Sequence, residues 1–356
     1  MKVKVDKKKF IDTLSVVSKA TPSNPPSPIL SGIQFKVEDD VLSLYSTDLE
    51  IGIVGKLKCE ADKDIAKVVP AKLVKNYVDN LATDEFELKF KENKLHINDA
   101  EFNVFNADEF PEMQSLNAVE FEIDQSKLKR LIDKTNFAVS QSNDENRNTL
   151  QGMRLEIKEN KIITVGTNTF RLAYKEINMT NDINLEKTIP YEITKILSNL
   201  LDEGKVNIIF ERNMIKFKLG TYEIVSRTIS GDYPNYNQVI PNDKATKVVM
   251  DKNDLKLAIK RANVFDDGNR ISLTLDNTVK VSELISEKGH TIEKVETQEF
   301  EGDISETNID GHYLLDVIKE LDSNIIILEC KGGEQPLVVK DEHDEGYKYL
   351  VMPIRK

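Results

Sequence analysis

The stretch VKVDKKKFIDTLSVVSKA, from Val3 to Ala20, returns in two variants further along the chain. These are FEIDQSKLKRLIDKTNFA from Phe121 and VVMDKNDLKLAIKRANVF from Val248. Each has a β-like run, an Asp, and apolar residues four and eight positions after that Asp. Such an Asp can accept hydrogen bonds from the free N–H groups of a helix start, and the apolar spacing gives the helix one buried face. The three segments therefore predict one fold unit that is repeated three times.

Other segments recur with a spacing of 120 residues. A second series of helices is expected to begin near Pro70, Pro190 and Asp310, in VVPAKLVKNYVDNL, TIPYEITKILSNLL and NIDGHYLLDVIKEL. Two stretches, PILSGIQFKVEDDVLSLYSTD from Pro28 and NTLQGMRLEIKENKIITVGTN from Asn148, both predict alternating strands joined by a polar turn. DEFPEM from Asp108 and GDYPNY from Gly231 form a fourth matching pair at a similar spacing. A common order with a common spacing favours true repeats over chance similarity.

The repeats place domain boundaries near residues 118 and 246. The predicted domains are 1–118, 119–245 and 246–356, each with two helices and roughly eight short strands. The predicted class is α+β and dominated by sheets, with threefold internal pseudo-symmetry. The expected helices span residues 7–20, 72–80, 125–138, 191–201, 252–263 and 311–321.

The composition limits the class of protein. The chain has 356 residues, of which 39% are hydrophobic, and no run approaches the ~20 apolar residues that span a bilayer. We therefore expect neither a signal peptide nor a transmembrane helix. Cys59 and Cys330 lie far apart in sequence, which is typical of a reduced, cytoplasmic chain.

Positive charge is concentrated on the predicted helices. The whole chain has a net charge of -12, yet the first helix of each repeat carries four cations and one Asp. A single basic helix would be read as a solvated face, but three such helices in an acidic protein indicate a common polyanionic partner. No recognition helix or zinc-finger spacing is present, so binding by shape and charge alone is expected.

Several motifs together resemble the bacterial sliding clamp, the β subunit family of DNA polymerase III. They are the period near 120, PIL-x-G after the first helix, TDLE at Thr47, FP at Phe110, YPNY at Tyr233 and the C-terminal YLVMPIRK. The resemblance covers the full length. It implies three tandem clamp-fold domains in a half-ring protomer, with the sheets outside and two helices per domain lining a pore. Two protomers would close head to tail around duplex DNA.

The same resemblance implies a processivity factor that slides on DNA and uses no cofactor. It would sit on the nucleoid and tether the replicative polymerase, the clamp loader, repair polymerases, mismatch-repair proteins and ligase through short linear peptides. The implied DNA-facing residues are Lys8, Lys19, Lys72, Lys127, Arg130, Lys134, Lys195, Lys252, Lys256 and Lys260.

Family clamps receive these peptides in a hydrophobic pocket between the second and third domains. Asn168 and Phe170 depart from the TDGHR form that is common among relatives, which affects the expected shape of the pocket. Val351 is expected to point into the core by strand alternation. The implied pocket residues are Leu150, Thr167, Thr169, Phe170, Arg171, Leu172, Pro234, Val239, Leu350, Met352, Pro353, Ile354 and Arg355.

Ring closure should pair edge strands of the first domain with those of the third domain of the other chain. By resemblance, Phe102 and Val104 on one side and Val264 and Phe265 on the other form the apolar seal. Two identical contacts would then close with twofold symmetry.

Two other classes of function compete with this reading. An enzyme is disfavoured because the sequence has no Walker loop, dinucleotide-binding motif, zinc-protease motif or nucleophile elbow. DEHDEG at Asp341 could form a metal site, but a solvated hairpin turn is the better interpretation. The other alternative is a three-repeat scaffold that binds proteins without encircling DNA.

Overall fold

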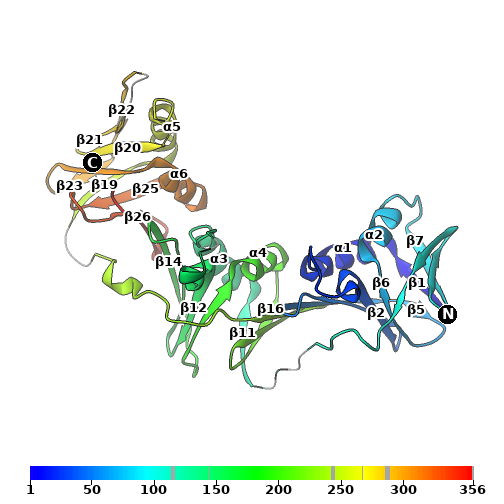
Figure 1. Ribbon diagram of the computed structural model, residues 1–356. Helices are drawn as coiled ribbons and strands as arrows, with labels where there is room; N and C mark the ends of the chain where they lie inside the picture. The colour runs from blue at the N-terminus through cyan, green and yellow to red at the C-terminus, as the bar shows by residue number, and fades with distance from the viewer. Residues whose placement is uncertain are drawn as a thin grey trace. The chain divides into compact units, whose positions relative to one another are not determined.

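The computed structural model describes residues 1–113, 116, 118–142, 144–241, 245–266, 268–284 and 289–354 (Figure 1). The chain divides into two compact units. The N-terminal unit contains Met1–Leu128 and Asn199–Thr228, and the C-terminal unit contains Lys129–Ser198 and Ile229–Lys356. The division falls inside the second repeat, so each unit holds parts of two successive repeats.

The N-terminal unit has two antiparallel sheets, and the larger one crosses a repeat boundary. In their sheet order, the five strands of the smaller sheet are β5 (Glu60–Ala61), β1 (Lys2–Asp6), β7 (Glu85–Lys91), β8 (Lys94–Ile97) and β9 (Ala100–Asn103). The nine strands of the larger sheet are β10 (Phe105–Asn106), β6 (Ile65–Val69), β2 (Ile33–Glu38), β3 (Val41–Thr47), β4 (Ile51–Lys58), β18 (Tyr222–Arg227), β17 (Met214–Leu219), β16 (Lys205–Glu211) and β11 (Val119–Asp124).

The C-terminal unit repeats this plan with one sheet of nine strands and one of four. The nine strands are β15 (Leu185–Pro190), β12 (Gly152–Lys158), β13 (Lys161–Thr167), β14 (Arg171–Asn178), β27 (Asp344–Val351), β26 (Leu337–Asp341), β25 (Ile325–Cys330), β19 (Thr246–Asp251) and β23 (Glu299–Glu301). The four strands are β22 (Ile292–Glu296), β21 (Thr278–Glu283), β20 (Arg270–Leu275) and β24 (Ser305–Asp310).

The described part of the chain has six α-helices, two for each repeat, as the sequence predicts. Asp6, Asp251 and Asp310 each accept a hydrogen bond from a backbone N–H in the first turn of the following helix, at 2.7–2.8 Å. Asp124 holds the equivalent position and pairs with Lys127 and Lys205. The helices are α1 (Lys7–Val17), α2 (Ala71–Asp79), α3 (Gln125–Asn136), α4 (Tyr191–Leu200), α5 (Lys252–Ala262) and α6 (Gly311–Glu320).

Alternation of side chains builds the cores between sheets and helices. On α1 the buried residues include Phe10, Leu14 and Val17, which share the face that the apolar spacing predicts. In the N-terminal unit α1 packs beside α2 and against β4, and in the C-terminal unit α5 packs beside α6 (Figure 1). The polar faces of these helices are therefore left for other contacts.

Two local predictions are wrong. PILS and the segment before Gly152 do not begin strands: they form the 3-10 helices η2 (Pro28–Ser31) and η3 (Glu145–Gln151). Pro28 occupies the first turn of η2, where its fixed φ and missing N–H are favourable, so this turn precedes the strand. DEHDEG does form the β26–β27 turn, but it is not simply solvated, because Asp341 and Asp344 are buried.

No helix of the described residues is both long and apolar enough to cross a membrane. Within the same residues, no group of three or more His, Cys, Asp or Glu side chains is placed to hold a metal ion.

Candidate functional site

The basic helix residues fall into two groups. Most are exposed or half-exposed on helix surfaces or ends, where they could contact a polyanion. Lys127 is exposed but pairs with Asp124 at 3.1 Å, and Lys195 lies over the ring of Tyr191 at 5.7 Å. The exposed members are Lys8, Lys19, Lys72, Lys127, Arg130, Lys195 and Lys260, and Lys256 is half-exposed.

Lys134 and Lys252 differ from the rest. The expected solvent exposure of Lys134 is wrong: it is 4% exposed, pairs with Asp322 at 3.0 Å and donates to the carbonyl of Glu320 at the end of α6. Lys252 is half-buried and donates to the carbonyl of Leu321 at 2.6 Å. A cation at a helix C-terminus satisfies free carbonyls and opposes the helix dipole. Both ammonium groups thus stabilise the C-terminal end of α6.

Arg130 joins a partly buried ion-pair network. Its guanidinium contacts Asp322 at 2.8 Å and Asp344 at 2.9 Å, while its side chain remains 46% exposed. Asp344 also pairs with the buried Lys175, which lies on β14 beside β27. Burial would raise the pKa of Asp344, but Lys175 and Arg130 outweigh it and hold that pKa below its usual value. The network links strands from two successive repeats.

The predicted peptide-pocket segment forms a tight turn between β13 and β14. Thr167 Oγ1 donates to the carbonyl of Arg171 at 2.6 Å and accepts from the N–H of Thr169 at 3.2 Å. Asn168 Oδ1 accepts from the N–H groups of Phe170 and Arg171, both at 3.0 Å. Thr169 adopts a φ of 78°, and Phe170 is left exposed. Asn168 thus has a structural role in shaping the turn.

Next to this turn, an apolar cluster covers the sheet. Leu172 and Leu350 are paired across β14 and β27, and both are buried in this cluster. Tyr236 belongs to it too, and Tyr233 packs against it, with its hydroxyl donating to the carbonyl of Val165 at 3.2 Å. Burial raises the pKa of both tyrosines, so their hydroxyl groups stay neutral. The cluster is an apolar floor with a few polar groups, which is typical of a ligand site.

The other predicted pocket residues come from three further segments of the chain. Pro234 and Val239 are exposed on the segment between β18 and β19. Leu150 is buried at the end of η3, where its carbonyl accepts from the N–H of Ser140 at 2.9 Å. Met352 donates its N–H to the carbonyl of Phe170 at 2.8 Å.

The C-terminal segment continues beyond β27. Pro353 and Ile354 are half-buried, and Ile354 donates its N–H to the carbonyl of Asn308 at 2.7 Å. Val351 is buried in the larger core of the C-terminal unit, as alternation predicts. Arg355 lies outside the described residues.

Arg171 is held in place by several contacts. Its guanidinium contacts Asp316 at 2.8 Å, donates to the carbonyl of Phe137 at 2.6 Å and lies 4.7 Å from the ring centre of Tyr313. These contacts join β14 to α6 and to the residue that follows α3. Arg171 therefore anchors the turn that carries Phe170.

Among the described residues, two strands at the edges of their sheets bear on the predicted interface. β9 ends the five-stranded sheet and β22 ends the four-stranded sheet. Phe102, on β9, makes an edge-to-face contact with Tyr77 at 5.7 Å, and Val104 is already buried within its own unit. Val264 is 70% exposed after α5, and Phe265 is half-buried. Phe102 and Val264 thus offer more apolar surface to a partner than Val104.

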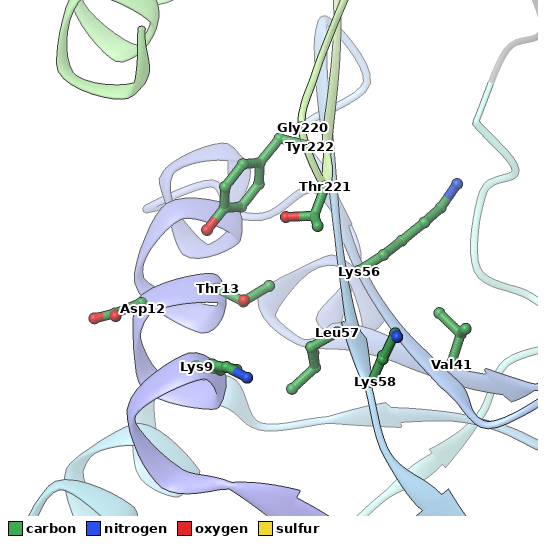
Figure 2. A pocket seen from close by; sticks show the side chains of 10 residues that line it. All are labelled: Lys9, Asp12, Thr13, Val41, Lys56, Leu57, Lys58, Gly220, Thr221 and Tyr222. Carbon is green, nitrogen blue, oxygen red and sulfur yellow. The ribbon is translucent and has the colours of Figure 1, made fainter. Parts of the chain in front are cut away.

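A cavity of about 640 Å³ opens between α1 and the β4–β18 junction (Figure 2). Lys9 and Thr13 reach it from α1, Leu57 from β4, and Tyr222 from β18. At the corresponding junction of the C-terminal unit, Tyr347 is fully buried. The sequence pattern alone did not indicate this cavity.

The apolar floor was predicted only in part: Leu172 and Leu350 belong to the predicted pocket, but Tyr233, Tyr236 and the ion-pair network do not. YPNY was a signal for Tyr233 and Tyr236, because two tyrosines around a Pro in a loop need a surface to pack on. No signal pointed to Lys175 and Asp344, since the partners lie 169 residues apart.

Three repeats that share sheets across their boundaries, with exposed basic residues on their helices and an apolar floor beside a turn, define the class as a clamp of three tandem domains. Family models of the DNA polymerase III beta subunit match in order: the N-terminal domain at residues 1–114, the central domain at 122–235 and the C-terminal domain at 237–355. The chain belongs to the DNA polymerase III beta subunit family, whose members are processivity factors and generally not catalytic.

Individual relatives agree over the full length. The beta sliding clamp of Bacillus subtilis is 27% identical, with 100% of both chains covered, and that of Staphylococcus aureus is 27% identical over 97% of each. The crystal structure of the Bacillus subtilis clamp superposes with a TM-score of 0.93 at 25% identity, covering 100% of this chain and 99% of the other. A Pseudomonas aeruginosa clamp bound to griselimycin gives a TM-score of 0.93 at 26% identity, covering both chains fully.

Proposed function

We propose that two copies of this chain close into a ring around duplex DNA, which slides without sequence preference and tethers a DNA polymerase. The observation that carries the proposal is a strand pairing that joins successive repeats at both boundaries within the chain. Among the described residues, the strands that would form the third such pairing, β22 and β9, both lie at the edges of their sheets. A closed ring is held on DNA by topology, so its contacts with phosphates can stay weak and screened by salt. A polymerase bound to the ring then experiences a high effective concentration of DNA.

The strand pairing at both repeat boundaries has one register. β4 pairs with β18 so that Ile51 lies opposite Ser226, and β14 pairs with β27 so that Arg171 lies opposite Val351. Ile51 and Arg171 are equivalent, because each begins the strand after the same turn, 120 residues apart. Each pairing makes a sheet of nine strands from two repeats.

The third pairing is open within one chain. β22 follows β20 and β21 as β4 follows β2 and β3, and β9 follows β7 and β8 as β18 follows β16 and β17. Both are edge strands, in sheets of four and five strands. Pairing β22 with β9 of a second copy would make a third nine-stranded sheet and remove two exposed edges. The repeated register would set Thr291 opposite Ala100 of the second copy.

The exposed helix lysines are proposed to face the DNA. A triple variant in which Lys8, Lys72 and Lys260 are each changed to Glu should bind DNA more weakly. The magnitude of its slope of log affinity against log salt should fall by about 3, because each lost phosphate contact contributes ~0.9. Fluorescence anisotropy on a DNA duplex at several salt concentrations measures this. The control replaces three exposed lysines elsewhere, Lys63, Lys91 and Lys218. Equal slopes for both variants would contradict the assignment.

The apolar floor of Leu172, Leu350 and Tyr236 is proposed to bind the short peptides of the replicative polymerase, clamp loader, repair polymerases, mismatch-repair proteins and ligase. Its support is the apolar lining beside an exposed turn, and anchor side chains of a peptide suit such a lining. Phe170 and Val239 supply exposed walls.

Val239→Glu is expected to weaken binding of a fluorescent peptide with Leu and Phe anchors by about tenfold or more, because a desolvated anchor contact contributes ~1–2 kcal/mol. The matched control is Asn237→Glu, which adds the same charge at a nearby exposed position. A titration in which both variants bind like the parent protein would rule out this wall.

We also propose domain limits at 1–118, 119–245 and 246–356, no catalytic activity of the chain itself, and action on the nucleoid in the cytoplasm. The matched family domains, and a role that requires chromosomal DNA, support these assignments.

A further inference from the structure

A second, smaller cavity with apolar and polar lining residues lies at the boundary of the first and second repeats, within the N-terminal unit. Its volume is about 110 Å³, the room of roughly four water molecules at ~30 Å³ each. This is enough for one aliphatic side chain. Its lining includes Tyr45, Leu49, Gly52, Pro111, Met113 and Val225.

The turn beside this cavity copies the turn beside the proposed peptide floor. Thr47 Oγ1 donates to the carbonyl of Ile51 at 2.7 Å and accepts from the N–H of Leu49 at 2.9 Å. Asp48 Oδ1 accepts from the N–H groups of Glu50 and Ile51 at 2.9 and 2.6 Å. Leu49 has a φ of 78°, the same value as Thr169. The two turns therefore share one hydrogen-bond pattern at a spacing of 120 residues.

The walls correspond as well. Gly52 pairs with Val225 at this boundary, where Leu172 pairs with Leu350 at the other. Gly52 has no side chain where Leu172 has one, and the ring of Tyr45 lies close against it: a Cβ there would lie 3.3 Å from that ring.

The loops over the two sites match too. Phe110 and Pro111 stand where the other loop has Tyr233 and Pro234, and Phe110 meets Tyr45 edge to face at 5.6 Å. Met113 packs on the same local core. Loop, turn and strand pair of the proposed peptide site thus recur at this cavity.

The rim of the second cavity is acidic. Glu50 and Glu112 are exposed, and both line it. Glu50 has a partner in Arg227 at 3.4 Å, but that pair is exposed and contributes little. The equivalent of Glu50 in the other turn is the neutral Phe170. Charge complementarity therefore favours a basic ligand here.

We infer that this cavity is a second docking site for short linear peptides, and that it takes one apolar anchor from a segment rich in Lys and Arg. The inference rests on the proposed peptide-binding function, because the second site copies the first. Its small volume and acidic rim make it selective for a single anchor between basic residues.

Methionine-methyl NMR separates the two sites in the intact protein. Met113 and Met214 line the second cavity, and Met352 lies beside the turn of the first. The probes are a capped hexapeptide KKLFKK and its charge-reversed counterpart EELFEE. We expect the basic peptide to shift the Met113 and Met214 methyl signals saturably, at least tenfold more tightly than the acidic peptide.

Unchanged Met113 and Met214 signals at millimolar KKLFKK would overturn the inference. If Met352 alone shifts, the second docking site is overturned, but the proposed peptide site at the apolar floor still stands. Shifts at Met113 and Met214 without any at Met352 would support the second site and count against the first. Equal affinity for both peptides would overturn the charge selectivity and with it the inference.

Variants at exposed positions complete the test. Leu49→Lys combined with Glu112→Lys removes an apolar wall and reverses the rim charge, and should weaken KKLFKK at Met113 at least tenfold. Leu49 is 52% exposed, so the fold should tolerate the change. Glu112→Gln gives a milder version, expected to weaken binding by several fold. Thr169→Lys, the matched change in the other turn, should leave the Met113 response unaltered; an equal loss in both turns would overturn the inference.

Discussion

Replacing Asp344 with alanine is expected to lower the free energy of unfolding of the C-terminal unit by about 3–5 kcal/mol. Lys175 is buried and has Asp344 as its ion-pair partner, so the substitution leaves an ammonium group buried without that carboxylate. Arg130 also loses a contact at 2.9 Å. For a unit of this size, the loss corresponds to a fall in Tm of roughly 6–20 °C. Denaturant unfolding followed by circular dichroism measures it.

The effect should depend on pH with a definite sign. Burial alone would raise the pKa of Asp344, yet its cationic partners hold that pKa below the unfolded value. The stabilisation is therefore present at neutral pH and is lost as the pH falls through the folded pKa. The difference between the parent and Asp344→Ala should shrink in acid.

The neighbouring Glu345→Ala serves as the control, because Glu345 is exposed. A difference below 1 kcal/mol between Asp344→Ala and Glu345→Ala at neutral pH would contradict the role of the network.

Glu101→Pro should raise the dissociation constant of the dimer at least about 100-fold. Val104, the residue after β9, donates its N–H to the carbonyl of Asn93. By alternation, Phe102 exchanges hydrogen bonds with β8, and the N–H of Glu101 points to the open edge. Proline removes that donor and places its ring at the edge, at a cost of ~3 kcal/mol. Each 1.4 kcal/mol is a factor of ten in affinity.

Glu101→Ala is the matched control, since it also removes the exposed ion pair with Lys94 but keeps the N–H. Sedimentation equilibrium gives both dissociation constants. If Glu101→Pro stays folded and dimerises like Glu101→Ala, β9 is not the interface strand.

The repeat could be read from the sequence because it depends on local spacing. Asp6, Asp251 and Asp310 cap helices whose apolar faces are visible in the letters alone, and six helices follow. The turn at Asn168 likewise reflects local chemistry, since Asn side chains accept from backbone N–H groups two and three residues ahead.

The structure was needed where contacts join distant parts of the chain. Lys134 looked like a solvent-facing member of a basic stripe, because helical spacing shows a face but not what packs on it. It is buried against the end of α6, 186 residues away. PILS was expected to be a strand, although Pro28 starts a 3-10 turn. The sheets that cross repeat boundaries could not be foreseen either. The spacing of the repeats along the sequence does not show which strands of neighbouring repeats pair, or in which register.

The most direct test of ring closure is a disulfide across the proposed interface. Ala100 and Thr291 would occupy a non-hydrogen-bonded pair, with Cα atoms ~4.5 Å apart, which suits a disulfide. The native Cys59 and Cys330 are buried and should not interfere. The protein with Ala100→Cys and Thr291→Cys is loaded on nicked circular DNA by an ATP-driven clamp loader and then oxidised, and the DNA is analysed in detergent. We predict a covalent dimer that stays linked to the circle and is released when the DNA is linearised. A monomer after oxidation, or a covalent dimer that leaves the intact circle, would contradict closure around DNA.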